Sequence, residues 1–106
     1  MYKNCCFKGL PGFDREPQDT MVYPGQIAYL SCTLLTSSNS LNIQWLKDEH
    51  PLLLDDSRMT ILPSGALEID DVNIQDIGSY MCNASSYGQS RLSNKAQLGL
   101  LTSDIG

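Results

Sequence analysis

Two cysteines 50 residues apart, with the only tryptophan of the chain between them, constrain the fold of this sequence most strongly. Cys32 precedes Trp45, and Tyr80 stands two positions before Cys82. Around these residues apolar and polar positions alternate, which is the period of a half-buried β-strand. Upstream of Tyr80, Asp76 precedes a tight turn that the tyrosine hydroxyl can cap. This order of residues is the pattern of a sandwich of two β-sheets.

The same alternation recurs along most of the chain, and no segment shows a sustained helical period of 3.6 residues. The sequence therefore predicts an all-β fold with at most one helical turn near residues 73–76. Pro17 interrupts the first strand. Because proline has no N–H to donate, it belongs at a sheet edge or at a switch between sheets. The expected strands cover residues 13–22, 27–34, 41–46, 52–54, 58–62, 67–72, 79–85 and 96–100.

From residue 12 to about residue 100, the order of Cys32, Trp45, Tyr80 and Cys82 resembles an I-set immunoglobulin domain. The resemblance implies an immunoglobulin-like, two-sheet Greek-key sandwich over residues 12–101. It leaves residues 1–11 as an N-terminal tail and residues 102–106 as a linker to a following domain. With 106 residues, the chain has the usual size of one such domain.

The four cysteines of the chain allow three pairings. The resemblance implies a disulfide between Cys32 and Cys82 with Trp45 packed against it. A bridge that closes a loop of about 50 residues would stabilise the fold by roughly 4 kcal/mol in the chain-entropy account. Cys5 and Cys6 receive no partner, because a bridge between adjacent cysteines is strained and the pair lacks a Cys-x-x-Cys spacing. They either pair with a preceding segment or have no role in this module.

Three further residues receive scaffold roles from the resemblance. The hydroxyl of Tyr80 is expected to bond backbone near Asp76, which is the tyrosine-corner arrangement. Arg58 and Asp76 resemble the ion pair that closes the bottom of such sandwiches through a bidentate contact. We therefore expect these residues to support the fold and not to bind a ligand.

The charge of the chain excludes several classes of partner. Seven Lys and Arg against twelve Asp and Glu give a formal charge of −5, and the sequence pI is about 4.5. This balance disfavours nucleic acids, anionic membranes and polyanions such as heparin. No run of roughly 18 to 20 apolar residues could span a bilayer, and the first residues lack the apolar segment of a signal peptide. An extracellular domain with this sequence would thus be a fragment of a larger protein.

The chain contains one glycosylation sequon and no catalytic constellation. Asn83-Ala84-Ser85 is the only Asn-x-Ser/Thr, and it predicts either an N-glycan on Asn83 or an unmodified surface asparagine. His50 is the only histidine and stands in a predicted turn, so we expect an exposed residue and no general base. We expect no cofactor and no metal, because the acidic pairs at 55–56 and 70–71 lack the loop pattern of a calcium site.

Apolar residues outside the expected core indicate a surface for a protein partner. The run Leu52-Leu53-Leu54 and the hairpin tip at Tyr87 are the candidate contacts, because exposed apolar patches mark interaction sites. The expected partners are a protein ligand, a like immunoglobulin domain, or neighbouring domains of the same chain. We expect neither nucleic-acid binding nor direct membrane insertion.

Within I-set domains, residues 56–69, and the run Leu62-Pro63-Ser64-Gly65-Ala66-Leu67 in particular, resemble netrin receptors of the DCC and neogenin type. Roundabout-like guidance receptors and neural adhesion molecules are similar to a lesser degree. The resemblance implies a non-catalytic ectodomain module of a single-pass plasma-membrane receptor for axon guidance or cell adhesion. The alternative is a structural I-set spacer of a large intracellular muscle-type protein with reduced cysteines. The sequon and the number of cysteines favour the extracellular interpretation, since disulfides persist in oxidising compartments.

Overall fold

The computed structural model describes residues 12–35, 41–86 and 88–102. The predicted N-terminal tail with Cys5 and Cys6, the tip residue Tyr87 and linker residues 103–106 lie outside these ranges. Within them the chain forms β-strands, one 3₁₀ turn and no α-helix, so the all-β prediction is confirmed. The elements are β1 (Phe13–Arg15), β2 (Thr20–Val22), β3 (Ala28–Leu30), β4 (Thr33–Leu34), β5 (Asn42–Lys47), β6 (His50–Pro51), β7 (Met59–Ile61), β8 (Leu67–Ile69), η1 (Ile74–Asp76), β9 (Gly78–Ser86), β10 (Gln89–Leu92) and β11 (Ala96–Leu100).

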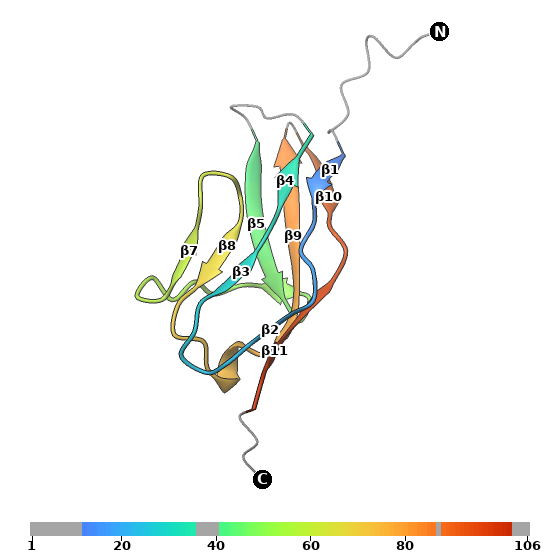
Figure 1. Ribbon diagram of the computed structural model, residues 1–106. Helices are drawn as coiled ribbons and strands as arrows, with labels where there is room; N and C mark the ends of the chain where they lie inside the picture. The colour runs from blue at the N-terminus through green and yellow to red at the C-terminus, as the bar shows by residue number, and fades with distance from the viewer. Residues whose placement is uncertain (1–11, 36–40, 87, 103–106) are drawn as a thin grey trace, which may run out of the picture.

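The strands form two layers with the core between them (Figure 1). One layer consists of β3, β8 and β7 in that order, together with the β1–β4 pair. The other has the order β2-β11-β9-β5-β6, with β10 also paired to β9. Strands that are neighbours in a sheet are mostly distant in sequence, which is the Greek-key connectivity expected of this sandwich.

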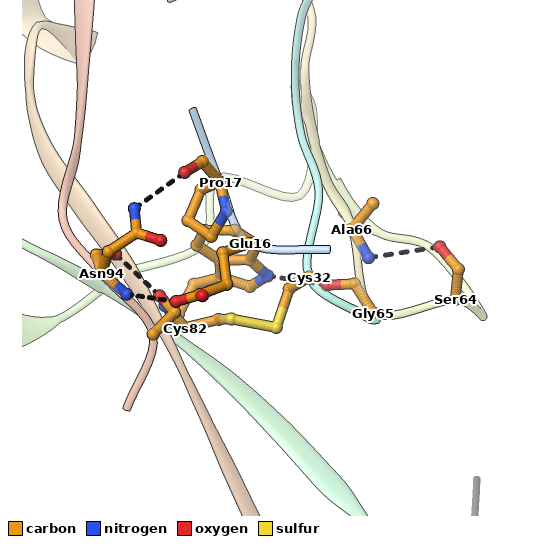
Figure 2. Close-up of a disulfide and its surroundings, with 10 residues drawn as sticks. Glu16, Pro17, Cys32, Ser64, Gly65, Ala66, Cys82 and Asn94 are labelled. Atoms are coloured by element: carbon orange, nitrogen blue, oxygen red, sulfur yellow. Dashed lines mark hydrogen bonds between the residues drawn. A yellow bond between two sulfur atoms is a disulfide. The ribbon is translucent and has the colours of Figure 1, made fainter. Parts of the chain in front are cut away.

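Pro17 stands where the chain changes sheets, as its missing N–H predicted. On one side β1 pairs with β4, and on the other β2 runs parallel to β11. Pro17 is fully buried between the two pairings. The side-chain amide of Asn94 donates to the carbonyl of Pro17 at 2.9 Å, and the backbone N–H of Asn94 donates to the carboxylate of Glu16 at 2.8 Å (Figure 2). The switch is therefore held by hydrogen bonds from the segment between β10 and β11.

The core follows the alternation of the sequence. In and around β3, Ala28 and Leu30 are buried, whereas Ile27 and Tyr29 are more than half exposed. The same period governs β9, where alternate residues are completely buried and the residues between them are only partly covered. The buried apolar cluster consists of Ala28, Leu30, Cys32, Trp45, Met59, Leu67, Ile69, Val72, Tyr80, Cys82 and Leu98.

The predicted strand at Leu52-Leu53-Leu54 is wrong. Backbone pairing after the tight β5–β6 turn ends at Leu52, whose N–H donates to the carbonyl of Trp45 at 2.9 Å. The chain then leaves this sheet for β7 in the other layer, so the next residues have no neighbouring strand. An apolar run alone did not distinguish a strand from a connection between sheets.

Gly65, in the Leu-Pro-Ser-Gly-Ala-Leu run, allows the turn between β7 and β8 to approach the core. Its φ of +101° lies in the left-handed region, and a Cβ there would stand 2.6 Å from the carbonyl oxygen of Cys32. The carbonyl of Gly65 accepts a hydrogen bond from the indole N–H of Trp45 at 2.9 Å. The family-specific run therefore has a structural role beside the cysteine bridge.

We expect Gly65→Ala to lower the free energy of unfolding by about 1–3 kcal/mol or more, because backbone strain and a backbone clash act together. Gly88→Ala is the matched control: Gly88 has a φ of +79° but no heavy atom within 4 Å of an added Cβ. Urea denaturation followed by tryptophan fluorescence measures both. Equal losses in the two variants would contradict the role given to the close approach.

Candidate functional site

The centre of the sandwich contains a disulfide between Cys32 and Cys82. The two Cα atoms are 6.4 Å apart, and both cysteines are completely buried. Trp45 is the cross-strand partner of Cys82 and is 3% exposed. Its indole N–H donates to the carbonyl of Gly65, from the opposite layer. The disulfide and the indole hydrogen bond therefore link the two sheets at the same level.

Below this bridge, Tyr80, Asp76 and Arg58 form one hydrogen-bonded corner. The Tyr80 hydroxyl donates to the backbone carbonyl of Asp76 at 2.6 Å. The guanidinium of Arg58 donates to both carboxylate oxygens of Asp76, at 2.9 and 3.0 Å. The Asp76 carboxylate also accepts the backbone N–H of Asn73 at 2.9 Å, which completes a capping box at the start of η1. These contacts join the residue before β7 to η1 and β9.

The ionisation of the corner follows from its contacts. Burial opposes the charge on Asp76, but the hydrogen bonds from Arg58 and from the Asn73 backbone outweigh it and lower the pKa of Asp76. The hydrogen bond with Asp76 raises the pKa of Arg58 further. Burial, followed by the nearby negative charge of Asp76, raises the pKa of Tyr80. At neutral pH the corner therefore holds an ion pair beside an un-ionised phenol.

Asn83, the sequon residue, lies on the outer face of the second sheet. It belongs to β9, between Gln44 of β5 and Leu92 of β10. Ala84 points into the core and is completely buried, so Asn83 and Ser85 share the outer face. Among the described residues, the side-chain oxygen of Asn83 is buried and accepts no hydrogen bond. A carbohydrate on Asn83 would cover part of this face.

The three candidate contact leucines lie in different environments. Leu52 is half-buried against the core cluster, whereas Leu53 is 88% and Leu54 45% exposed. Beside them an open apolar cleft of about 150 Å³ lies at the border of β5, β6 and β7, here called the edge cleft. Its lining consists of Ile43, Gln44, Trp45, Pro51, Leu52, Leu54 and Ile61.

Comparison with known proteins identifies the family to which this sandwich belongs. Residues 11–86 match the family described as immunoglobulin domain. The chain is an immunoglobulin domain. It is 38% identical to mouse (Mus musculus) neogenin over 93 residues, which cover 88% of the chain and 6% of neogenin. It is 32% identical to the human (Homo sapiens) netrin receptor DCC over 92 residues, which cover 85% of the chain and 6% of DCC. The resemblance to netrin receptors is thereby confirmed, over a small part of each relative.

Solved structures agree with the fold of this immunoglobulin domain. The tandem Ig repeats of Dlar superpose with a TM-score of 0.78 at 22% identity, over 88% of this chain and 49% of that one. The titin M3 domain superposes with a TM-score of 0.74 at 22% identity, over 90% of this chain and all of the titin domain. At this identity both comparisons show the fold alone.

The remaining polar candidates of the immunoglobulin domain are surface groups with local partners. His50 is exposed, and its ring Nδ1 lies 2.8 Å from the carbonyl of Asp48 in the same turn. The carboxylate of Asp55 accepts hydrogen bonds from Ser57 and Arg58. In the described ranges, no three His, Cys, Asp or Glu residues lie close enough to hold a metal ion. Across the same ranges, no helix is long and apolar enough to cross a membrane.

Sequence reasoning missed the residues that shape the connection before β11 in this immunoglobulin domain. Ser93 is buried, and its hydroxyl accepts the N–H of Cys82 at 3.0 Å. Its own N–H donates to the carbonyl of Cys82 at 2.9 Å, and the next residue, Asn94, secures the Pro17 switch. Both residues are small and polar, and they are adjacent in sequence. Ordinary loops contain the same kinds of residue. The signal in the sequence was therefore too weak to distinguish them.

Proposed function

We propose that this chain is a non-catalytic extracellular module of a single-pass receptor for axon guidance or cell adhesion, which binds a protein ligand or a like domain. The module would span residues 12–101, between the tail 1–11 and the linker 102–106. The observation that carries the proposal is the 38% identity to neogenin over 88% of the chain. A second such relative is the netrin receptor DCC. Because a fold alone does not imply a function, the identity in sequence is given more weight than the superpositions.

The buried disulfide supports an oxidising compartment. A bridge such as Cys32–Cys82 persists in secreted proteins and on cell surfaces, whereas cytosolic thiols are kept reduced. The negative charge of the chain and its apolar surface agree with a protein as partner. The proposal assigns no reaction to the chain, and its role is binding.

The alternative is a spacer domain of an intracellular muscle-type protein. The titin M3 domain has the same fold over its full length, with a TM-score of 0.74. Its identity of 22% is lower than that of the receptor relatives. In the intracellular alternative Cys32 and Cys82 would be reduced thiols, whereas the structure contains the bridge between them. The receptor module is therefore the preferred proposal.

When the chain is secreted from mammalian cells, we expect an N-glycan on Asn83. Peptide N-glycosidase should lower the intact mass of the secreted chain, because Asn83 and Ser85 face outward from β9. Asn83→Gln should remove this loss of mass, whereas Gln44→Asn, on the neighbouring strand and outside any sequon, should leave it unchanged.

The same sample tests the receptor proposal against the spacer. A secreted chain that contains the Cys32–Cys82 bridge and loses mass on deglycosylation agrees with a receptor ectodomain. A secreted chain with neither the bridge nor the glycan would contradict the extracellular assignment and favour the spacer.

A further inference from the structure

The edge cleft lies where the two sheets of the sandwich are not joined by a full strand. On one side β6 has only two residues, and on the other β7 is the last strand of its sheet. The connection that follows Leu52 crosses this gap, and residues 53–55 belong to no strand. The side chains of Ile43, Leu54 and Ile61 reach the opening, which remains accessible from outside. The core is therefore incompletely covered at this border.

The dimensions and lining of the edge cleft fit one apolar side chain. Apart from Gln44, every lining residue is apolar or proline, and the volume is about 150 Å³. An apolar protein cavity of about 150 Å³ holds a molecule as large as benzene. Leu53 stands in the chain between the lining residues Leu52 and Leu54 and is 88% exposed, so it is available to cover an inserted group. This combination of a pocket and an exposed apolar neighbour is typical of anchor sites in protein interfaces.

The two residues that follow the lining residue Leu54 in the chain are acidic, and we call them the acidic rim of the edge cleft. Asp55 and Asp56 follow Leu54 directly, and both are exposed. The hydrogen bonds from Ser57 and Arg58 lower the pKa of Asp55, so it is ionised at neutral pH. The adjacent cation is Arg58. Its guanidinium donates hydrogen bonds to the carboxylates of Asp55 and Asp76 and to the backbone carbonyls of residues 70 and 71. Among the described residues no cation pairs with Asp56, so a negative charge remains at the rim, and the chain as a whole is also negative.

We propose that the edge cleft binds a segment of a protein ligand that presents one Leu-sized apolar side chain flanked by Lys or Arg. The apolar side chain fills the cleft, and the cations lie against the acidic rim of Asp55 and Asp56. This inference rests on the proposed function and specifies the chemistry of its partner. Charge complementarity distinguishes this occupant from a second copy of the chain, whose own acidic rim would meet the first across the contact.

Peptides that differ in one feature at a time test the proposal with the 106-residue chain. The ¹⁵N-labelled chain is titrated with a Lys-Lys-Leu-Lys-Lys peptide, with its Ala-centred form and with its Glu-flanked form. We expect saturable amide shifts at residues 43, 54 and 61 with the first peptide only. Exchange of the flanks to Glu should weaken binding at least about tenfold, because like charges then face each other. Higher salt should lower the affinity of the Lys-flanked peptide, because its charged contacts with the rim are exposed to solvent.

Two single variants distinguish binding in the edge cleft from non-specific association with exposed apolar residues. Leu53→Ala should weaken the binding of the Lys-flanked peptide about fivefold to tenfold, because it removes the apolar cover of the anchor. Ile27→Ala is the matched control, since Ile27 is also a solvent-exposed aliphatic residue, 57% exposed, but lies before β3. It should leave the affinity unchanged. Asp56→Asn should lower the affinity for the same peptide and make this affinity less dependent on salt.

Three results would overturn the proposal. Equal shifts with all three peptides would mean non-specific association, and shifts confined to other residues would place the contact elsewhere. Without peptide, amide shifts at residues 43, 54 and 61 that increase with protein concentration would mean that a second copy of the chain occupies the cleft. None of these results changes the disulfide or the glycan of the secreted chain. Failure of this inference is thus distinguishable from failure of the proposed function.

Discussion

Replacing Cys32 and Cys82 together by alanine should lower the free energy of unfolding by roughly 4 kcal/mol, because the bridge closes a loop of 50 residues. Small domains have a total stability of about 5–15 kcal/mol, so the loss is a large fraction of it. Urea denaturation at 25 °C measures the loss, with Trp45 as the only indole reporter. Changing both residues avoids a single reactive thiol in the core.

The reduced wild-type chain is the control for this variant. In the presence of a reductant it should unfold at nearly the same urea concentration as the double variant, since both lack the bridge. The expected difference in the free energy of unfolding between the oxidised wild type and the double variant is roughly 4 kcal/mol. A difference of less than about 1 kcal/mol would mean that the bridge is not a main support of the sandwich.

The second large effect is expected at the corner. Asp76→Ala should lower the free energy of unfolding by about 3 kcal/mol, near the lower end for a broken buried ion pair. The variant leaves Arg58 without its bidentate partner and the N–H of Asn73 without its acceptor. The loss stays near the lower end because the side chain of Arg58 is 19% exposed and keeps its contact with Asp55.

Asp70→Ala serves as the matched control, because Asp70 is exposed and its contacts with Arg58 are made by the backbone. It should change the free energy of unfolding by no more than about 0.5 kcal/mol. Equal losses in the two variants would contradict the special role of the corner carboxylate.

The pH dependence of stability gives a second measure of the corner. The folded pKa of Asp76 lies below its ordinary value of 3.8. Its contribution is therefore fully present above the unfolded pKa and is lost as the pH falls through the folded pKa. Between pH 5 and about pH 2, the wild type should lose more stability than Asp76→Ala. Parallel curves for the two proteins would mean that Asp76 is not held ionised by its partners.

The parts of the fold that were predictable from sequence are those with a repeating or well-spaced signal. Alternation at Ala28 and Leu30 indicated which face of the strand is buried, and Pro17 indicated the change of sheet through its missing donor. The spacing of Cys32, Trp45 and Cys82 indicated the sandwich, because Trp45 and Cys82 lie on paired strands and Cys32, between β3 and β4, faces them from the other layer. These signals are local, so a single sequence contains them.

The edge cleft and the connection before β11 depend on contacts between distant segments. Leu52 and Leu53 are chemically identical neighbours, yet one packs on the core and the other is 88% exposed. Their difference arises from the end of pairing after β6 and not from the residues themselves. Gly65 likewise looks like an ordinary turn glycine until the carbonyl of Cys32 is found 2.6 Å from where a Cβ would stand. Such features require the packed structure.

The most direct test of the account is the disulfide map of the chain secreted from mammalian cells. Trypsin, after removal of any glycan, should release residues 16–47 and 59–91 as two peptides, while Cys5 and Cys6 fall in a separate peptide, 4–8. We expect mass spectrometry of the non-reduced digest to find peptides 16–47 and 59–91 joined through Cys32 and Cys82. Both peptides recovered separately with alkylated, free cysteines would contradict the bridged sandwich, and with it the extracellular receptor module.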